Sequence, residues 1–195
     1  MSHQKRTLAT TFVAMLAIGL APAIRADVHD KKTIVTFSAP VEVPGKALPA
    51  GTYVFKLLDS TSNRNILQIW DKDEKQLLAT ILAIPDYRLT PPDKPVIAFE
   101  ERPSNTPEAI KAFFYPGDNY GLQFVYPRDK AVQLAKRTNQ HVLSMPNEMA
   151  KNMKAQPTSA NDASVQEMKN TEVTGVSPAG EPVALEVVIL VKPEK

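Results

Sequence analysis

The chain has 195 residues and no cysteine, and its 23 lysines and arginines slightly outnumber its 21 aspartates and glutamates. The lack of cysteine excludes disulfides, thiolate catalysis, zinc–thiolate sites and a lipid-modified N-terminal cysteine. The small basic excess also gives no support for nucleic-acid binding, because it comes from the first 26 residues. Without Lys5, Arg6 and Arg25, the rest of the chain has 20 basic and 21 acidic residues.

The N-terminus has the three parts of a secretory signal peptide. Lys5 and Arg6 precede an uncharged run from Leu8 to Ile24, and small residues follow up to Ala26. The run is shorter than the ~20 apolar residues that a membrane-spanning helix needs. We therefore predict that residues 1–26 are removed on export, with cleavage after Ala26 or, alternatively, after Ala23. The mature protein is expected in the periplasm or outside the cell, with no transmembrane span.

Residues 27–145 are predicted to form one all-β, mainly antiparallel domain, a β-sandwich or small barrel. All twelve aromatic residues outside the signal lie between Phe37 and Tyr126, which marks the core. About seven strands with period-2 patterns are separated by proline, glycine and polar turns, with no alternation of strand and helix. The strand segments are Lys32–Ser38 continuing into Val41–Val43, Thr52–Leu58, Asn65–Trp70, Gln76–Ile84, Val96–Glu101, Ile110–Tyr115 and Gly121–Tyr126.

One short helix is expected after Pro127. Asp129 is positioned to cap it, while Ala131, Leu134 and Ala135 share one face. Thr138 and Asn139 mark its end, and the helix is expected to pack on an end or edge of the sheet.

Two further segments complete the predicted organisation. Residues 146–182 contain no aromatic residue and are rich in polar side chains, which predicts a flexible linker. The segment Val183–Val191 has the composition of a nine-residue strand, within a terminal segment 183–195. An unpaired strand of this kind would aggregate, so it should pair with an edge of the same domain or, alternatively, with another molecule.

The sequence contains no recognisable catalytic motif. His29 and His141 are the histidines that remain after cleavage, and no Gly-x-Ser-x-Gly, His-Glu-x-x-His or glycine-rich phosphate loop is present. Glu100 and Glu101 are adjacent on a predicted strand and point to opposite faces, which is unsuitable for a paired-acid site. We therefore predict no catalytic residue, metal site or cofactor.

An aromatic cluster is the feature that best suggests a binding role. The stretch Phe113–Tyr120 places aromatic residues on both faces of one strand and in the turn that follows. Because side chains alternate, one set should face solvent, a second layer or a partner. Phe113, Tyr115, Tyr120 and, separately, Trp70 are the candidate binding residues, and burial under a second layer is the structural alternative.

Three strand-and-turn segments of the predicted domain are Leu48–Phe55, Phe99–Pro103 and Phe113–Gly121. Together they resemble an exported β-rich family of unknown function found mainly in Acidobacteria, in a similarity that covers about residues 30–145. The resemblance implies an exported β-rich domain and carries no activity.

The sequence thus favours an exported, non-enzymatic module that binds a protein or a polymer such as a polysaccharide in the cell envelope. A secreted hydrolase with its active site on loops such as Arg88–Pro95 and Arg102–Pro107 is one alternative. A structural subunit that assembles through its C-terminal strand is the other.

Overall fold

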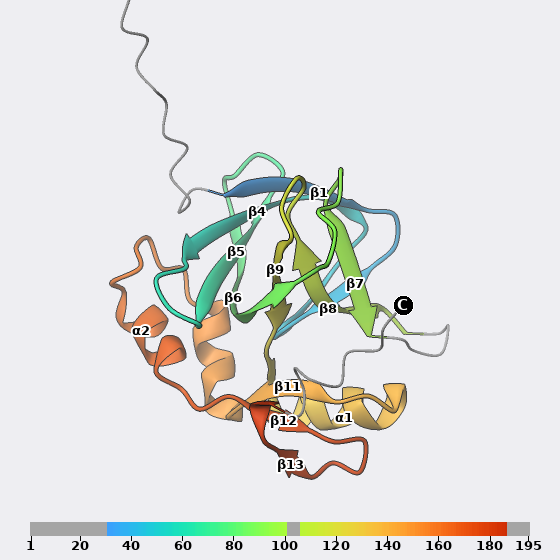
Figure 1. The fold of residues 1–195 in the computed structure, drawn as a ribbon. Coiled ribbons are helices and arrows are strands. Elements are labelled where there is room, and N and C mark those ends of the chain that lie inside the picture. The colour runs from blue at the N-terminus through green and yellow to red at the C-terminus, as the bar shows by residue number, and fades with distance from the viewer. Residues whose placement is uncertain (1–30, 101–105, 187–195) are drawn as a thin grey trace, which may run out of the picture.

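Two β-sheets form the framework of residues 31–100 and 106–186, the part of the chain that the computed structural model describes (Figure 1). Most strand pairs are antiparallel, and the helices are few and short. The predicted fold class, an all-β and mainly antiparallel sandwich-like domain, is confirmed.

The larger sheet contains the strands that the sequence pattern predicts and one further short strand, β3. Its order is β1-β4-β5-β6-β9-β8-β2-β3, with β7 paired to β8, and the β2–β8 pair alone among these strands is parallel. The strands are β1 (Lys32–Phe37), β2 (Val41–Val43), β3 (Lys46–Leu48), β4 (Gly51–Asp59), β5 (Asn65–Asp71), β6 (Leu77–Tyr87), β7 (Val96–Glu100), β8 (Glu108–Phe114) and β9 (Tyr120–Phe124).

This sheet curls around its own core. Phe55 of β4 and Phe113 of β8 meet edge to face, with ring centroids 5.3 Å apart, although their strands are not hydrogen-bonded neighbours. Contact between two distant strands requires the sheet to bend until its inner surfaces face each other. Tyr53, Phe55 and Leu57 all enter this main core, as their predicted common face requires. The result is barrel-like.

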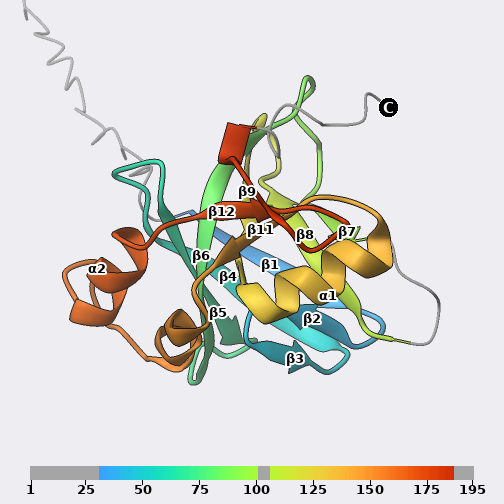
Figure 2. The same ribbon diagram turned by 90° about the horizontal axis from the view of Figure 1, so that it is seen from below.

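A second sheet and helix α1 (Arg128–Thr138) lie beneath the curled sheet (Figures 1 and 2). The sheet contains β10 (Tyr126–Pro127), β11 (Val142–Met145), β12 (Thr174–Val176) and β13 (Pro182–Val183). The predicted helix is confirmed, and its face of Ala131, Leu134 and Ala135 is buried in the main core.

The predicted cap of α1 is wrong, whereas its predicted end is right. Pro127 occupies the N-cap position, and Asp129 lies within the first turn, where its carboxylate complements the helix dipole. The backbone N–H of Asp129 is bound by the side-chain oxygen of Asn147, so a residue distant in sequence satisfies this helix end. Asn139 ends the helix in the left-handed conformation, with φ of 54°.

The prediction of a flexible linker over residues 146–182 is wrong. This segment contains the 3-10 helix η2 (Asn147–Lys154), helix α2 (Ala163–Lys169) and strand β12. Met153, Val165 and Met168 belong to a second buried cluster together with Ile66 of β5 and Leu82 of β6. Residues 146–176 therefore form a cover, in which η2 and α2 lie on the outer face of the larger sheet and β12 joins the second sheet.

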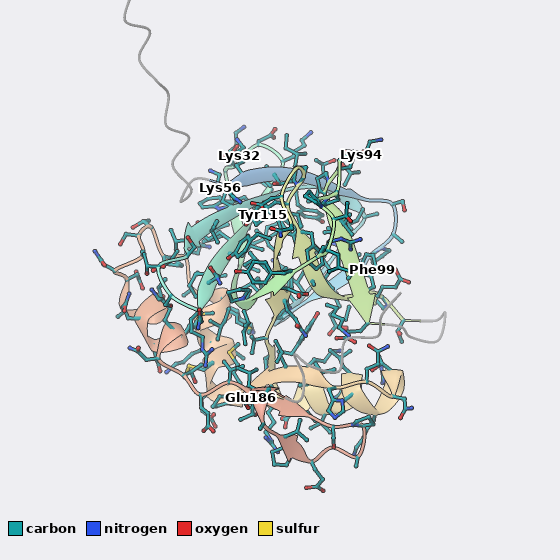
Figure 3. All side chains as sticks on the ribbon, in the orientation of Figure 1. Lys32, Lys56, Lys94, Phe99, Tyr115 and Glu186 are labelled. Carbon is teal, nitrogen blue, oxygen red and sulfur yellow. The ribbon has the colours of Figure 1, made fainter. Side chains whose placement is uncertain are left out.

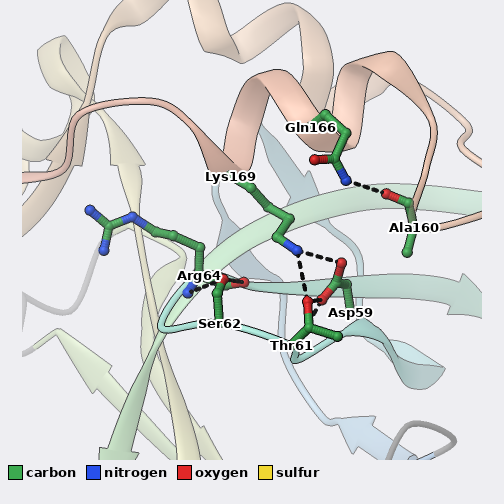
Figure 4. A network of polar contacts seen from close by, with 7 residues as sticks. All are labelled: Asp59, Thr61, Ser62, Arg64, Ala160, Gln166 and Lys169. Carbon is green, nitrogen blue, oxygen red and sulfur yellow. Dashed lines mark hydrogen bonds and ion pairs between the residues drawn. The ribbon is translucent and has the colours of Figure 1, made fainter.

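Polar contacts hold this cover at several points. Gln68 and Thr80 donate side-chain hydrogen bonds of 2.8 Å and 3.0 Å to the backbone carbonyls of Pro157 and Ala155. At the other end of the cover, Lys169 binds Asp59 and Thr61 in the β4–β5 turn (Figure 4). The physical reason for the cover is that β5 and β6 are apolar on both faces, so the outer face also needs burial.

Three predicted features fall wholly or partly outside the described residues. The signal peptide, residues 1–26, is one of them, and residues 102–105 of the second predicted active-site loop are another. Of the predicted C-terminal strand, Val183 lies in β13, while Leu185 and Glu186 adopt helical backbone conformations. The remainder, residues 187–191, lies beyond the described part.

Candidate functional site

The structure divides the four candidate binding residues between two places. Phe113, Tyr115 and Tyr120 form one cluster on the β8–β9 hairpin, whereas Trp70 lies on β5 and points to the outer face.

Phe113 is a core residue, so its assignment as a binding residue is wrong. Its side chain is fully buried and packs edge to face against Phe55 and against Tyr115. Phe114, on the other face of β8, is buried as well, because the Arg88 guanidinium lies 5.1 Å from its ring centroid and Gly121 packs against the ring. Both faces of β8 are therefore covered, as the alternative of burial under a second layer expects.

Tyr115 and Tyr120 stack in parallel at the turn between β8 and β9. Their ring centroids are 6.0 Å apart with an interplanar angle of 11°. The ammonium of Lys31 lies 4.9 Å from the Tyr115 centroid and 5.3 Å from the Tyr120 centroid, a cation–π arrangement with both rings. The same ammonium donates to the carboxylate of Asp118 at 2.5 Å. Figure 3 marks Tyr115 in the upper part of the molecule.

We call Lys31, Tyr87, Tyr115, Asp118 and Tyr120 the tyrosine cluster. The hydrogen bond from Lys31 and that from the backbone N–H of Tyr120 hold the pKa of the Asp118 carboxyl below its usual range. Burial, followed by the nearby Tyr87 and Asp118, raises the pKa of Tyr120 to about 12. Burial likewise raises the pKa of the Tyr115 phenol. At neutral pH the Asp118 carboxyl is therefore ionised, and the phenols of Tyr115 and Tyr120 are neutral.

Beneath the cluster lies a small polar region in an otherwise apolar core. The hydroxyl of Tyr120 donates a 2.9 Å hydrogen bond to Oδ1 of Asn65 at the start of β5. Within the described residues, the Tyr115 hydroxyl and Nδ2 of Asn65 are buried and have no hydrogen-bond partner. Buried polar atoms of this kind cost free energy, so Tyr115 and Asn65 are not optimised for stability alone.

The exposed part of the cluster is Tyr87 and its neighbour Leu89. Tyr87 meets Tyr120 edge to face at 5.8 Å and remains 60% exposed, while Leu89 is fully exposed. Of the described residues, the large hydrophobic side chains that are exposed are these two and Ile34. Sequence reasoning missed Lys31, Tyr87 and Leu89. The sequence signal for Tyr87 and Leu89 was the Tyr-Arg-Leu run just before the proline-rich loop.

The loop that carries Leu89 is held against the tyrosine hairpin. The backbone N–H of Arg88 donates to the carbonyl of Asn119 at 2.8 Å, and that of Gly117 donates to the carbonyl of Pro92 at 2.7 Å. Gly117 has φ of 70°, which favours glycine in this turn. Two loops distant in sequence are thus hydrogen-bonded to each other. The backbone next to Tyr87 and Leu89 is therefore held in place.

Trp70 occupies a separate, half-buried position near the β5–β6 turn. Its indole N–H donates to Gln68 Oε1 at 3.2 Å, and the Lys56 ammonium lies 5.2 Å from its ring centroid. Lys56 and Lys32 both pair with Glu74, and a hollow of 380 Å³ lies beside these side chains. The lysine thus covers one face of the indole in a cation–π contact. A binding role for Trp70 stays a prediction from the sequence.

The described residues give no further site of a recognisable chemical type. Within residues 31–100 and 106–186, no group of three or more histidine, aspartate or glutamate side chains is arranged to hold a metal ion. In the same residues, no helix has the length and apolar character needed to cross a membrane.

Comparisons of the chain with protein-family models, curated proteins and solved structures find no match. The resemblance to the Acidobacteria family stays a prediction from the sequence.

Proposed function

We propose that this protein is an exported, non-enzymatic binding module whose tyrosine cluster, together with Leu89, contacts a protein or polymer partner in the cell envelope. The observation that supports the proposal is the exposure of Tyr87, at the end of β6, and of Leu89, in the loop that follows and is hydrogen-bonded to the β8–β9 hairpin. Aromatic and aliphatic side chains presented from a rigid backbone bind with little loss of conformational entropy.

The chemistry of the exposed residues favours a protein over a polysaccharide. The edges of Tyr87 and the aliphatic Leu89 are suited to an apolar pocket on a partner. A sugar ring would use a flat aromatic face with polar groups around it, and the faces of Tyr115 and Tyr120 are already stacked on each other and on Lys31. Export rests on the predicted signal over residues 1–26 and places the partner in the periplasm or outside the cell.

The proposal is tested by comparing matched variants of the mature chain. Immobilised protein is crosslinked to envelope extract of the source organism, and captured species are identified by mass spectrometry. The double variant Tyr87→Ala, Leu89→Asp should lose a species that the wild type captures. The control Ile34→Ala removes an exposed hydrophobic residue on β1 and should retain that species.

A parallel sedimentation with purified cell-wall sacculi tests the polymer alternative. Cosedimentation that depends on Tyr87 and Leu89 would identify a polymer partner. Capture that is identical for the wild type and the double variant, in both assays, would contradict the proposed surface. Intact-mass analysis of the protein from the envelope fraction tests export, since it should begin at Asp27 or Ile24.

A further inference from the structure

Strand β1 lies at one end of the larger sheet and is open along one side. It pairs with β4 through an unbroken antiparallel register, from Lys32 opposite Lys56 to Phe37 opposite Gly51. On its other side, β1 pairs with no strand in the described part of the chain. A regular edge strand of six residues is a template to which another strand can be added.

The hydrogen bonds to β4 decide which backbone groups of β1 point to the open side. The N–H of Leu57 donates to the carbonyl of Lys31 at 3.0 Å, and the register of β1 and β4, continued by one residue, places these two residues directly opposite each other. Hydrogen-bonded and non-hydrogen-bonded positions alternate along an antiparallel pair. The odd-numbered residues of β1 therefore direct their N–H and C=O groups to β4, and the even-numbered residues 32–36 direct theirs to the open side.

The side chains of β1 leave this open side unprotected. Ile34, at the centre of the exposed face, is 64% exposed. The charge of the strand is on Lys32, which pairs with Glu74 in the β5–β6 turn. The same carboxylate pairs with Lys56 of β4, so the Lys32 side chain lies over the sheet and away from the open edge. Lysine protects an edge strand when it projects from the edge, and here it does not.

We propose that β1 pairs antiparallel with β1 of a second copy of this chain, with the twofold axis at Ile34. In this register Ile34 lies opposite Ile34 of the second copy, and Lys32 lies opposite Thr36 of the second copy. Each opposed pair of even-numbered residues then exchanges both of its N–H···O=C hydrogen bonds. The outward-pointing backbone groups of residues 32–36 are thereby all satisfied in both copies.

The self-complementarity of this register favours a second copy over an unrelated strand. Exposed residues meet exposed residues, and the core-facing Thr33 meets the core-facing Val35, so both faces of the sheet keep their character. No like charges are opposed, and the exposed Ile34 gains an apolar cross-strand neighbour. Moving the axis by one residue leaves either Lys32 or Thr36 without an opposed residue inside β1. The register centred on Ile34 therefore uses the open edge most fully.

The expected complex is a weak dimer that depends on concentration. Pairing of one short strand gives an interface in the class below about 1,200 Å², which is typical of transient association. A twofold dimer also carries two copies of the tyrosine cluster, which increases its avidity for a partner with repeated sites. The inference does not rest on the proposed function, because Tyr87 and Leu89 lie outside β1. Dimerisation and partner capture can therefore fail separately.

The lack of native cysteine permits a test of the register. The variants Ile34→Cys, Lys32→Cys and Thr36→Cys each place one thiol on the same exposed face, and disulfide formation is followed under mild oxidation. Opposed Cα atoms in a hydrogen-bonded antiparallel pair are about 5.5 Å apart, within the range that a disulfide spans. We expect Ile34→Cys to form a covalent dimer about tenfold faster than either of the other variants alone. A mixture of Lys32→Cys and Thr36→Cys should restore rapid crosslinking, because these two positions are opposed.

Sedimentation velocity of the cysteine-free protein provides the second measurement. The wild type should shift from monomer to dimer as its concentration rises. Ile34→Lys places like charges at the twofold axis and should stay monomeric over the same range. The control Ala47→Lys adds a lysine to an exposed position of β3 and should dimerise like the wild type.

Two results would overturn the proposal. A wild type that stays monomeric at every concentration up to its solubility limit would exclude the dimer, and a dimer that Ile34→Lys leaves intact would place the interface elsewhere. Equal crosslinking rates for the three single-cysteine variants would exclude the register centred on Ile34.

Discussion

Lys169 of α2 donates a 2.6 Å hydrogen bond to the carboxylate of Asp59, a residue 110 positions earlier at the end of β4. The two side chains are 12% and 4% exposed, so this ion pair is largely shielded from water. Thr61 also donates to Asp59 through its hydroxyl and its backbone N–H, both at 2.8 Å. The contact fixes the cover of residues 146–176 to the larger sheet.

Lys169→Met should therefore destabilise the protein by about 3 kcal/mol, because it leaves a buried carboxylate without its cation. The free energy of unfolding in urea measures this effect. Lys154→Met changes an exposed lysine on η2 of the same cover and should alter stability by less than about 0.5 kcal/mol. Similar values for the two variants would show that the ion pair contributes little.

The same ion pair should make stability depend on pH in the acid range. Burial tends to raise the pKa of Asp59, but the hydrogen bonds from Lys169 and Thr61 outweigh it and lower the pKa. A group whose pKa falls on folding stabilises the protein above its unfolded pKa, about 3.9, and this contribution is lost as pH falls through the folded pKa. Wild-type stability should thus decline below about pH 4, and Asp59→Asn should flatten this decline in urea titrations.

Gly121 is a second position where the geometry makes a definite prediction. A Cβ at this residue would lie 2.3 Å from Cδ1 of Phe114 and 2.7 Å from the carbonyl oxygen of Phe113. Gly121→Ala should cost about 2–3 kcal/mol, because both neighbours are fixed in a packed strand. Gly117→Ala is the matched variant, since its Cβ would meet nothing within 4 Å and only its φ of 70° opposes alanine.

Gly117→Ala should consequently cost about 1 kcal/mol, the usual penalty for a left-handed backbone. Thermal and urea unfolding of the two variants measure the difference. A cost for Gly121→Ala no larger than that for Gly117→Ala would show that Phe114 can move aside.

The two stacked tyrosines should respond in opposite ways to loss of the hydroxyl. Tyr115→Phe removes a buried hydroxyl that lacks a partner among the described residues, so stability should stay equal or rise by up to about 1 kcal/mol. Tyr120→Phe deprives Oδ1 of Asn65 of its donor and should cost about 1–2 kcal/mol. Equal losses in the free energy of unfolding for both variants, measured in urea, would contradict the different roles given to the two hydroxyl groups.

Alkaline pH offers an independent check on Tyr120. Its pKa is raised by folding from about 10 to about 12. The stability that this shift provides is therefore complete below about pH 10 and is lost as pH rises toward 12. Tyr120→Phe should show a shallower alkaline decline than the wild type. Equal alkaline losses of stability in Tyr120→Phe and the wild type would show that a group other than Tyr120 is responsible.

The sequence predicted the strands of the larger sheet because each carries a local pattern that ends at a turn residue. The Asp71–Lys75 connection and the Pro116–Tyr120 turn are both hairpins, as polar and glycine-containing turns indicate. Helix α1 was likewise visible from Ala131, Leu134 and Ala135. In each case the relevant contacts are close in sequence.

What the sequence did not predict depends on contacts between distant segments. Val165 and Met168 are an apolar i, i+3 pair within a polar segment, and they become a core face only because the outer surface of β5 and β6 needs a cover. Similarly, Phe114 is buried by Arg88, which comes from another loop. The tyrosine cluster needs Lys31, whose position over Tyr115 follows from the curl of the sheet rather than from any motif.

The cover of residues 146–176 depends on apolar packing between α2 and the larger sheet. Met168→Ala removes a fully buried side chain from the second cluster and should cost about 3 kcal/mol, since a cavity would remain between α2 and the sheet. A flexible linker would tolerate this change without loss. The exposed Gln156→Ala, within the same segment, should cost less than about 0.5 kcal/mol. Urea unfolding followed by the fluorescence of Trp70, the single tryptophan, reports the effect at the sheet, and a free energy of unfolding unchanged by Met168→Ala would contradict the packed cover.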